Sequence, residues 1–282
     1  MADVGALLGE GPVWVARDAA LYWVDIKGYK IFRLDKVGEV HQWTTPFRIA
    51  SLAPRHRGGF VAGTDRGFAE VDLDAMRFEP FGHPEADRVN NRFNDGKLDR
   101  AGRFWAGTMD DTEQAATGAL YRLDPNRSWY RADDNYRVTN GPAFSRSGRL
   151  MYHNDSARQV TYVFDLDEAG MPSNRREFAL HGEGDGYPDG MTVDAEDCLW
   201  VAFWDGWCVR RFSPAGICLA KFHLPVQMPT SCAFGGPLLD KLYVTSASIG
   251  LSESEREQQP CAGGLFMLDT SCVGLADVPF EG

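Results

Sequence analysis

The sequence lacks the marks of a protein that is exported or embedded in a membrane. It contains no run approaching the roughly 20 apolar residues that a membrane-spanning helix requires. Its first residues, Met1-Ala2-Asp3-Val4, do not begin a basic stretch followed by an apolar one, as a secretory signal would. We therefore expect a cytoplasmic protein with no membrane partner.

Paired cysteines, a serine-hydrolase motif and surplus basic charge are also missing. The six cysteines show no Cys-x-x-Cys spacing, which argues against a zinc knuckle or redox dithiol and favours reduced structural thiols. No Gly-x-Ser-x-Gly turn occurs, so serine-esterase chemistry is not expected. The 29 Lys and Arg residues are outnumbered by 40 Asp and Glu, for a net charge of -11. Nucleic acids bind through basic surfaces, so they are excluded as expected partners. No obligate protein partner is evident either.

Helical periodicity is scarce, and a repeat of short strands takes its place. Six aromatic or β-branched runs, bounded by Gly, Asp and Pro, begin 39 to 49 residues apart. A period in the forties with several short strands in each unit is typical of a propeller blade. We predict an all-β, six-bladed β-propeller in which residues 1–282 form a single domain. Residues 1–7 are expected to add a strand to the last blade near Gly263–Asp269, closing the ring. The six runs are Leu21–Val24, Phe60–Gly63, Phe104–Gly107, Leu150–His153, Leu199–Ala202 and Leu242–Thr245.

Polar side chains recur at one phase of this repeat. Glu10, Asn94, Asn140 and Asp189 each lie 10 or 11 residues before an aligned run, and each is followed by glycine within two positions. Ser231 has the same phase, and the second unit has Ala50 and Ser51 there. Because the innermost strand of each blade faces the channel, these positions should converge on the propeller axis. Taken singly, Asn-Gly and Asp-Gly are ordinary turn dipeptides; four at matching phase favour a shared site.

Two carboxylates and two amides placed together predict a cation site. Neighbouring buried carboxylates repel each other, and a divalent cation removes that cost. Oxygen-only ligands suit Ca²⁺, which we take as the first candidate, or Mg²⁺ and Mn²⁺; Zn²⁺ and Fe²⁺ are alternatives.

Six motifs are spread along the chain: Leu8–Trp14, Arg92–Lys97, Gly102–Met109, Asn140–Pro142, Pro188–Met191 and Gly263–Phe266. Through these motifs the chain resembles the regucalcin and gluconolactonase family of metal-dependent sugar lactonases over nearly its whole length. The resemblance implies that Glu10, Asn140 and Asp189 bind the metal, and that Arg92 and Asn94 hold substrate hydroxyls. A substrate-contacting Glu of that family falls in a stretch where this chain has other residues. We take Asp111 as its counterpart, with Asp110 and Glu113 as alternatives.

The resemblance implies hydrolysis of a sugar aldonolactone, such as gluconolactone or xylonolactone, with Asp189 also accepting a proton from the attacking water. A broader lactonase or organophosphate hydrolase is one alternative, and a non-enzymatic calcium-binding regulatory protein is another. The alternative for Arg92 is a surface ion pair with Asp87 or Asp95. The run Tyr152–Asp155 is expected to line the pocket, with His153 as a hydrogen-bonded histidine rather than a ligand.

Overall fold

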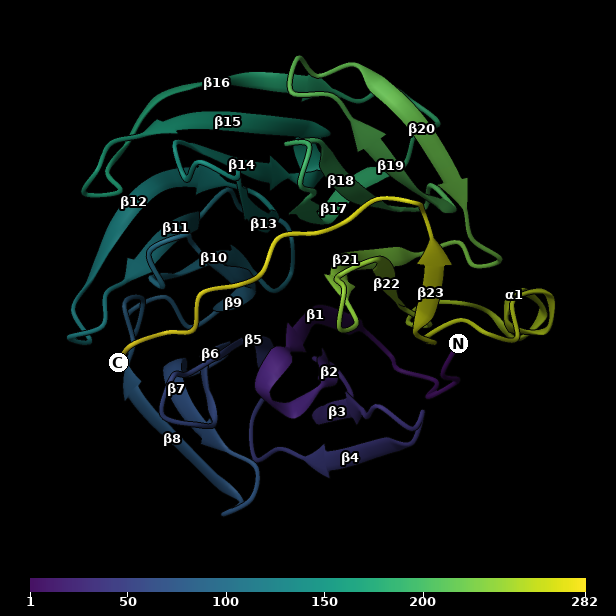
Figure 1. The fold of residues 1–282 in the computed structure, drawn as a ribbon, viewed down its shortest axis with the longest axis horizontal. Coiled ribbons are helices and arrows are strands. Elements are labelled where there is room, and N and C mark those ends of the chain that lie inside the picture. The colour runs from purple at the N-terminus through teal and green to yellow at the C-terminus, as the bar shows by residue number, and fades with distance from the viewer.

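The computed structural model describes all 282 residues, and they form six antiparallel sheets arranged around a ring (Figure 1). This confirms the predicted β-propeller. The first three sheets are β1 (Gly9–Val15), β2 (Ala20–Asp25), β3 (Lys30–Leu34) and β4 (Val40–Thr44); β5 (Ile49–Pro54), β6 (Phe60–Thr64), β7 (Gly67–Asp72) and β8 (Arg77–Gly82); and β9 (Asn91–Leu98), β10 (Phe104–Asp110), β11 (Gly118–Leu123) and β12 (Trp129–Tyr136). The other three are β13 (Thr139–Phe144), β14 (Leu150–Asp155), β15 (Val160–Leu166) and β16 (Pro172–Leu180); β17 (Tyr187–Val193), β18 (Leu199–Trp204), β19 (Cys208–Phe212) and β20 (Cys218–His223); and β21 (Pro229–Gly235), β22 (Lys241–Ser246) and β23 (Phe266–Asp269).

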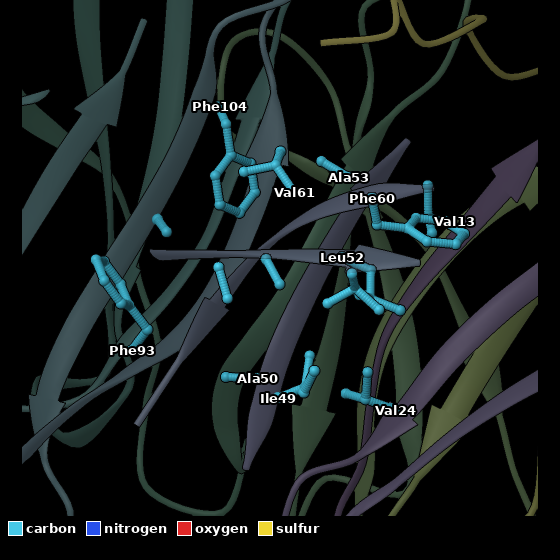
Figure 2. Close-up of a cluster of buried hydrophobic side chains, with 14 of the residues drawn as sticks. Val13, Val24, Ile49, Ala50, Leu52, Ala53, Phe60, Val61, Phe93 and Phe104 are labelled. Atoms are coloured by element: carbon cyan, nitrogen blue, oxygen red, sulfur yellow. The ribbon is translucent and has the colours of Figure 1, made fainter. Parts of the chain in front are cut away.

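The aligned sequence runs are the second strands of the blades, β2, β6, β10, β14, β18 and β22. These strands are buried on both faces because each blade packs against its neighbours, which explains their nearly continuous apolar character. Where the first three blades meet, a cluster of 27 buried residues includes Leu52, Phe60, Phe93 and Phe104 (Figure 2). The blades are therefore held together mainly by apolar packing between sheets.

A β-bulge interrupts every inner strand at the same phase. The register between the first and second strand shifts once in each of the six blades. In the first and fourth blades the shift follows directly after Glu10 and Asn140, and in the fifth blade it includes Asp189. A bulge bends the strand and redirects a side chain. Because of the shared bulge, these side chains do not follow the alternation between the two faces of the sheet that a regular strand imposes.

The N-terminus helps to close the ring, and the C-terminal segment crosses one face of it. At the N-terminus, Ala2 forms a single bridge with Leu265, with hydrogen bonds of 2.8 Å in both directions, in place of the predicted strand. The C-terminal segment, residues 270–282, leaves β23 and crosses the face of the propeller (Figure 1). It forms bridges from Gly274 to Asp194 and from Phe280 to Arg55. Because both partners directly follow inner strands, this segment covers the end of the axis where those strands finish.

Helix is a minor component of the fold. The one α-helix, α1 (Glu253–Gln258), begins at Ser252 with a capping box completed by Glu255. Two single 3₁₀ turns, Ala16–Asp18 and Ser156–Arg158, follow β1 and β14. No helix in the structure has the length and apolar character needed to span a bilayer.

Candidate metal centre

All six predicted site residues line one cavity of about 580 Å³ at the start of the inner strands. Its volume is within the range of pockets that hold small molecules. The aligned phase of the repeat therefore does bring residues from four blades together. The six are Glu10, Arg92, Asn94, Asp111, Asn140 and Asp189.

Glu10 and Asp189 are buried carboxylates without a cationic partner. They are 4% and 5% exposed, and neither forms an ion pair. Burial, together with repulsion from Asp95, raises the pKa of Glu10 well above its ordinary value. Burial and the nearby charge of Glu10 raise the pKa of Asp189 in the same way. Glu10 Oε2 accepts the Gly11 amide at 3.0 Å, but Asp189 Oδ1 is buried and accepts no hydrogen bond.

The two predicted amide residues are tied to each other beside these carboxylates. Asn94 Nδ2 donates to Asn140 Oδ1 at 2.9 Å and to the Thr139 carbonyl at 2.8 Å. Asn140 Nδ2 donates to Ser156 Oγ at 2.8 Å, and Ser156 Oγ donates in turn to the Pro188 carbonyl at 2.6 Å. This series of hydrogen bonds orients the Asn140 side chain so that its amide oxygen lies on the side away from Ser156.

Asp189 is positioned through its backbone by a neighbouring blade. Asn154 Nδ2 donates to the Asp189 carbonyl at 2.7 Å, and Asn154 Oδ1 accepts from Thr161 Oγ1 at 2.6 Å. Asn154 is fully buried. It therefore holds the bulge of β17 in place without reaching the cavity.

The glycines of the repeat serve two different purposes. Gly11 and Gly141 have φ values of 54° and 84°, a left-handed conformation that glycine adopts without steric cost. Gly190 has an ordinary φ, but a Cβ at this position would clash with the Ser231 side chain of the next blade. The glycine after Asp189 is needed for close packing around the axis rather than for a turn.

Asp95 is a third axial carboxylate, which the sequence suggested only as a partner for Arg92. It is 6% exposed and accepts the amides of Gly96 at 2.7 Å and Gly141 at 2.9 Å. Burial raises its pKa to about 6, although Lys97 opposes the shift. Asp95 lines a second, smaller cavity and does not line the large one. It therefore adds negative charge near the site without being able to contact a ligand in the large cavity.

The residues present fit a divalent cation. Two uncompensated buried carboxylates and one oriented amide oxygen are hard oxygen donors, and Asp189 Oδ1 has no partner within the protein. Burying such carboxylates together without a counter-charge is unfavourable. Glu10, Asn140 and Asp189 are therefore the residues that would hold the ion.

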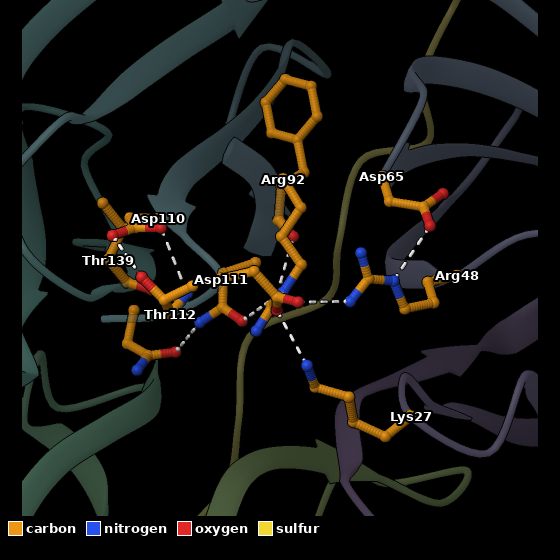
Figure 3. A network of polar contacts seen from close by, with 11 residues as sticks. Lys27, Arg48, Asp65, Arg92, Asp110, Asp111, Thr112 and Thr139 are labelled. Carbon is orange, nitrogen blue, oxygen red and sulfur yellow. Dashed lines mark hydrogen bonds and ion pairs between the residues drawn. The ribbon is translucent and has the colours of Figure 1, made fainter. Parts of the chain in front are cut away.

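Arg92 and Asp111 belong to a network of charges at one side of the cavity (Figure 3). Asp111 accepts hydrogen bonds from Arg92 Nε, from Lys27 Nζ at 2.8 Å and from Arg48 Nη1 at 2.7 Å. Burial opposes ionisation of Asp111, but these three cations hold its pKa well below the ordinary value. Arg92 Nη1 also donates to Asn94 Oδ1 at 2.7 Å. The alternative considered for Arg92, a surface ion pair with Asp87 or Asp95, is not found, because the buried Arg92 pairs with Asp111 instead.

The loop after β10 separates the three acidic candidates for substrate contact. Asp111 and Glu113 line the cavity, whereas Asp110 does not. The Asp110 carboxylate accepts the amides of Thr112, Gln114 and Ala115 and thereby shapes the loop.

The run Tyr152–Asp155 does not line the cavity; Ser156 and Ala157, which follow it, do. His153 is fully buried, and neither ring nitrogen has a hydrogen-bond partner, so the expected hydrogen bond is absent. Burial, and then the charge of Arg175, lowers the pKa of His153 to about 3. This histidine is a neutral core residue that packs edge-on against Tyr136.

Comparison with known proteins identifies relatives along the whole chain. The SMP-30/Gluconolactonase/LRE-like region matches residues 8–248. A 6-deoxy-6-sulfogluconolactonase of Pseudomonas putida is 37% identical over 98% of this chain and 96% of its own length. Regucalcin of Xenopus laevis is 36% identical over 98% of this chain and 95% of its own. The crystal structure of a calcium-binding protein, regucalcin from Agrobacterium tumefaciens, superimposes with a TM-score of 0.95 at 26% identity, covering 99% of this chain and 95% of that one.

Proposed function

The chain belongs to the SMP-30/gluconolactonase/LRE-like family, and on that premise we propose that it is a metal-dependent lactonase that hydrolyses a sugar aldonolactone to the aldonic acid. The observation that carries the proposal is the pair of uncompensated carboxylates, Glu10 and Asp189, beside Asn140 in a cavity of about 580 Å³. The activity for which the Pseudomonas putida relative is named, on a sulfogluconolactone, supports the substrate class.

The polar lining of the cavity supports a hydroxyl-rich substrate over an apolar organophosphate. Seven of the 19 lining residues are charged. Arg92 is held by Asp111 and Asn94, and no hydrogen bond from its Nη2 atom occurs within the protein. That donor, in a rigid guanidinium, is suited to a ring hydroxyl. Trp204 also lines the cavity, and stacking of its indole on a sugar ring is part of the proposal.

When bound, a divalent cation supplies Lewis-acid polarisation of a carbonyl and lowers the pKa of water. Asp189 is the general base in this proposal as well as a residue that would hold the ion, because its Oδ1 atom accepts no hydrogen bond within the protein. The water oxygen attacks the lactone carbonyl carbon and gives its proton to Asp189. The bond from that carbon to the ring oxygen then breaks, and the ring oxygen takes the proton back as a hydroxyl. Asn154 keeps Asp189 in position through the 2.7 Å bond to its backbone.

Acid release from glucono- and xylonolactone, corrected for spontaneous ring opening, tests the proposal. We expect turnover by the metal-loaded protein and its loss with a chelator. At saturating metal, Asp189→Asn should lose roughly 10²- to 10⁴-fold in kcat, the usual range for a general base. Full turnover in that variant would contradict the role of Asp189. Metal binding without acceleration of any lactone would instead favour a calcium-binding protein.

A further inference from the structure

Arg137 is the one cationic residue of the cavity lining without a carboxylate partner. Lys27 and Arg92 also line the cavity, but both form ion pairs with Asp111. The Arg137 guanidinium makes a single hydrogen bond, from Nε to the Glu113 carbonyl at 3.0 Å, and no ion pair. Its two terminal nitrogens therefore have no protein partner.

The position of Arg137 is fixed by a buried carboxylate behind it. Asp155 is fully buried and accepts the amides of Arg137 at 3.1 Å and Val138 at 3.3 Å. It also pairs with Arg158 at 2.8 Å, which balances its charge without Arg137. The backbone amide and the Nε atom of Arg137 are both held by hydrogen bonds. The side chain therefore loses little additional conformational freedom when its two terminal nitrogens, its free edge, bind a ligand.

The distance along the chain from Arg137 to the metal centre is short. Asn140 lies three positions further along the chain, which limits the span between the two Cα atoms to about 10 Å. Val138, between them, lines the same cavity. Arg137 is therefore within reach of the far end of a lactone whose carbonyl lies at the metal centre, when that end turns to this side of the cavity.

The charges of the loaded cavity also favour an anion. The lining contains four carboxylates, Glu10, Asp111, Glu113 and Asp189, and three cations, Lys27, Arg92 and Arg137. A divalent ion at Glu10 and Asp189 leaves one positive charge in excess. Arg137 is exposed and has no counter-ion, so the excess positive charge is accessible to a ligand at this residue.

We infer that the free edge of Arg137 binds an oxyanion carried by the substrate, so that the preferred lactone bears a sulfonate, phosphate or carboxylate on the carbon farthest from its carbonyl. The inference rests on the proposed lactonase function. A planar guanidinium with two unpaired nitrogens suits an oxyanion better than a hydroxyl, because it can donate two parallel charge-assisted hydrogen bonds.

Matched lactones and matched variants test this role. Glucono-1,5-lactone is compared with its derivatives that carry sulfonate, phosphate or carboxylate at carbon 6. For the wild type we expect kcat/KM to be at least about tenfold higher for one of the three anions than for the neutral lactone. Arg137→Gln should lower kcat/KM for that anionic lactone roughly ten- to a hundredfold, mainly through KM, and affect the neutral lactone far less. Arg137→Lys should recover part of the loss.

The control is Arg149→Gln, which removes an arginine that pairs with Glu168 on a distant turn and should leave the preference intact. Equal losses on neutral and anionic lactones in Arg137→Gln would mean that Arg137 only anchors the Glu113 loop. That result, or the absence of any preference in the wild type, would overturn the inference.

Binding separates failure of this inference from failure of the lactonase proposal. Calorimetry compares gluconate with its 6-sulfonate, 6-phosphate and 6-carboxylate analogues on the metal-loaded protein, where no turnover is needed. Tighter binding of one anionic analogue, weakened in Arg137→Gln, would support the anion site even if no lactone were hydrolysed. Equal affinities for gluconate and all the analogues would refute it.

Discussion

Replacing Glu10 by glutamine should have opposite effects on the metal-free and the metal-loaded protein. Glu10 is 4% exposed, has no cationic partner and lies near Asp189 and Asp95. A carboxyl whose pKa is raised by folding costs the folded state stability as the pH rises above about 4. Each unit of elevation amounts to about 1.4 kcal/mol at a pH above the raised value. The amide removes the charge but can still accept the Gly11 hydrogen bond.

We therefore expect metal-free Glu10→Gln to be more stable than the metal-free wild type by about 1–4 kcal/mol at pH 8, within the range for replacing buried charge with neutral groups. In a chain near this size each kcal/mol raises Tm by about 2–4 °C. A metal at 100 times its Kd adds about 2.7 kcal/mol to the wild type, and the variant should lose most of this gain.

Thermal unfolding in chelator and in excess Ca²⁺, together with calorimetric titration of the metal, measures both effects. Glu168→Gln, a change at a side chain that is 89% exposed, is the control and should alter neither. A metal-free Glu10→Gln protein that is less stable than wild type, or one that binds metal as tightly, would refute the reasoning.

Two further predictions concern residues around the site. His153 is neutral in the fold, because its pKa is lowered to about 3. Its contribution to the free energy of unfolding is therefore lost as the pH falls below about 6.5, where the unfolded chain binds a proton at this residue. Between pH 8 and pH 5 this costs the wild type about 2 kcal/mol; His153→Phe should lower that pH dependence in urea unfolding, and an unchanged dependence would contradict it. Asp111→Asn removes the shared partner of Lys27, Arg48 and Arg92 and should cost about 1–3 kcal/mol at neutral pH, discounted for its partial exposure. Since the pKa of Asp111 is held low, this difference should shrink below about pH 4; a difference independent of pH would argue against an electrostatic origin.

The repeat and its phase could be predicted because both are local properties. Each second strand is buried between blades, so its apolar run is visible in the sequence wherever it occurs. The residues that precede it by a fixed spacing share a strand position, which is why the spacing alone groups Glu10, Asn140 and Asp189.

The charged network was not predictable in the same way. Lys27, Arg48 and Asp111 come from three different blades, and their contacts depend on loops whose course no periodicity describes. For this reason the alternative partners considered for Arg92, Asp87 and Asp95, are not the ones found. The C-terminal segment across the face escapes prediction for a similar reason, since its two bridges join residues 80 and 225 positions apart, Asp194 to Gly274 and Arg55 to Phe280.

Glu10, Asn140 and Asp189 are proposed to form a metal centre that hydrolyses a sugar lactone. The most direct test is acid release from gluconolactone by protein stripped of metal with a chelator and then restored with one equivalent of Ca²⁺, Zn²⁺ or Mn²⁺. We predict background hydrolysis in the stripped protein, recovery of turnover with at least one of these ions, and a recovery that is roughly 10²-fold or more weaker in Asp189→Asn. Equal acceleration by stripped and restored protein would contradict the account.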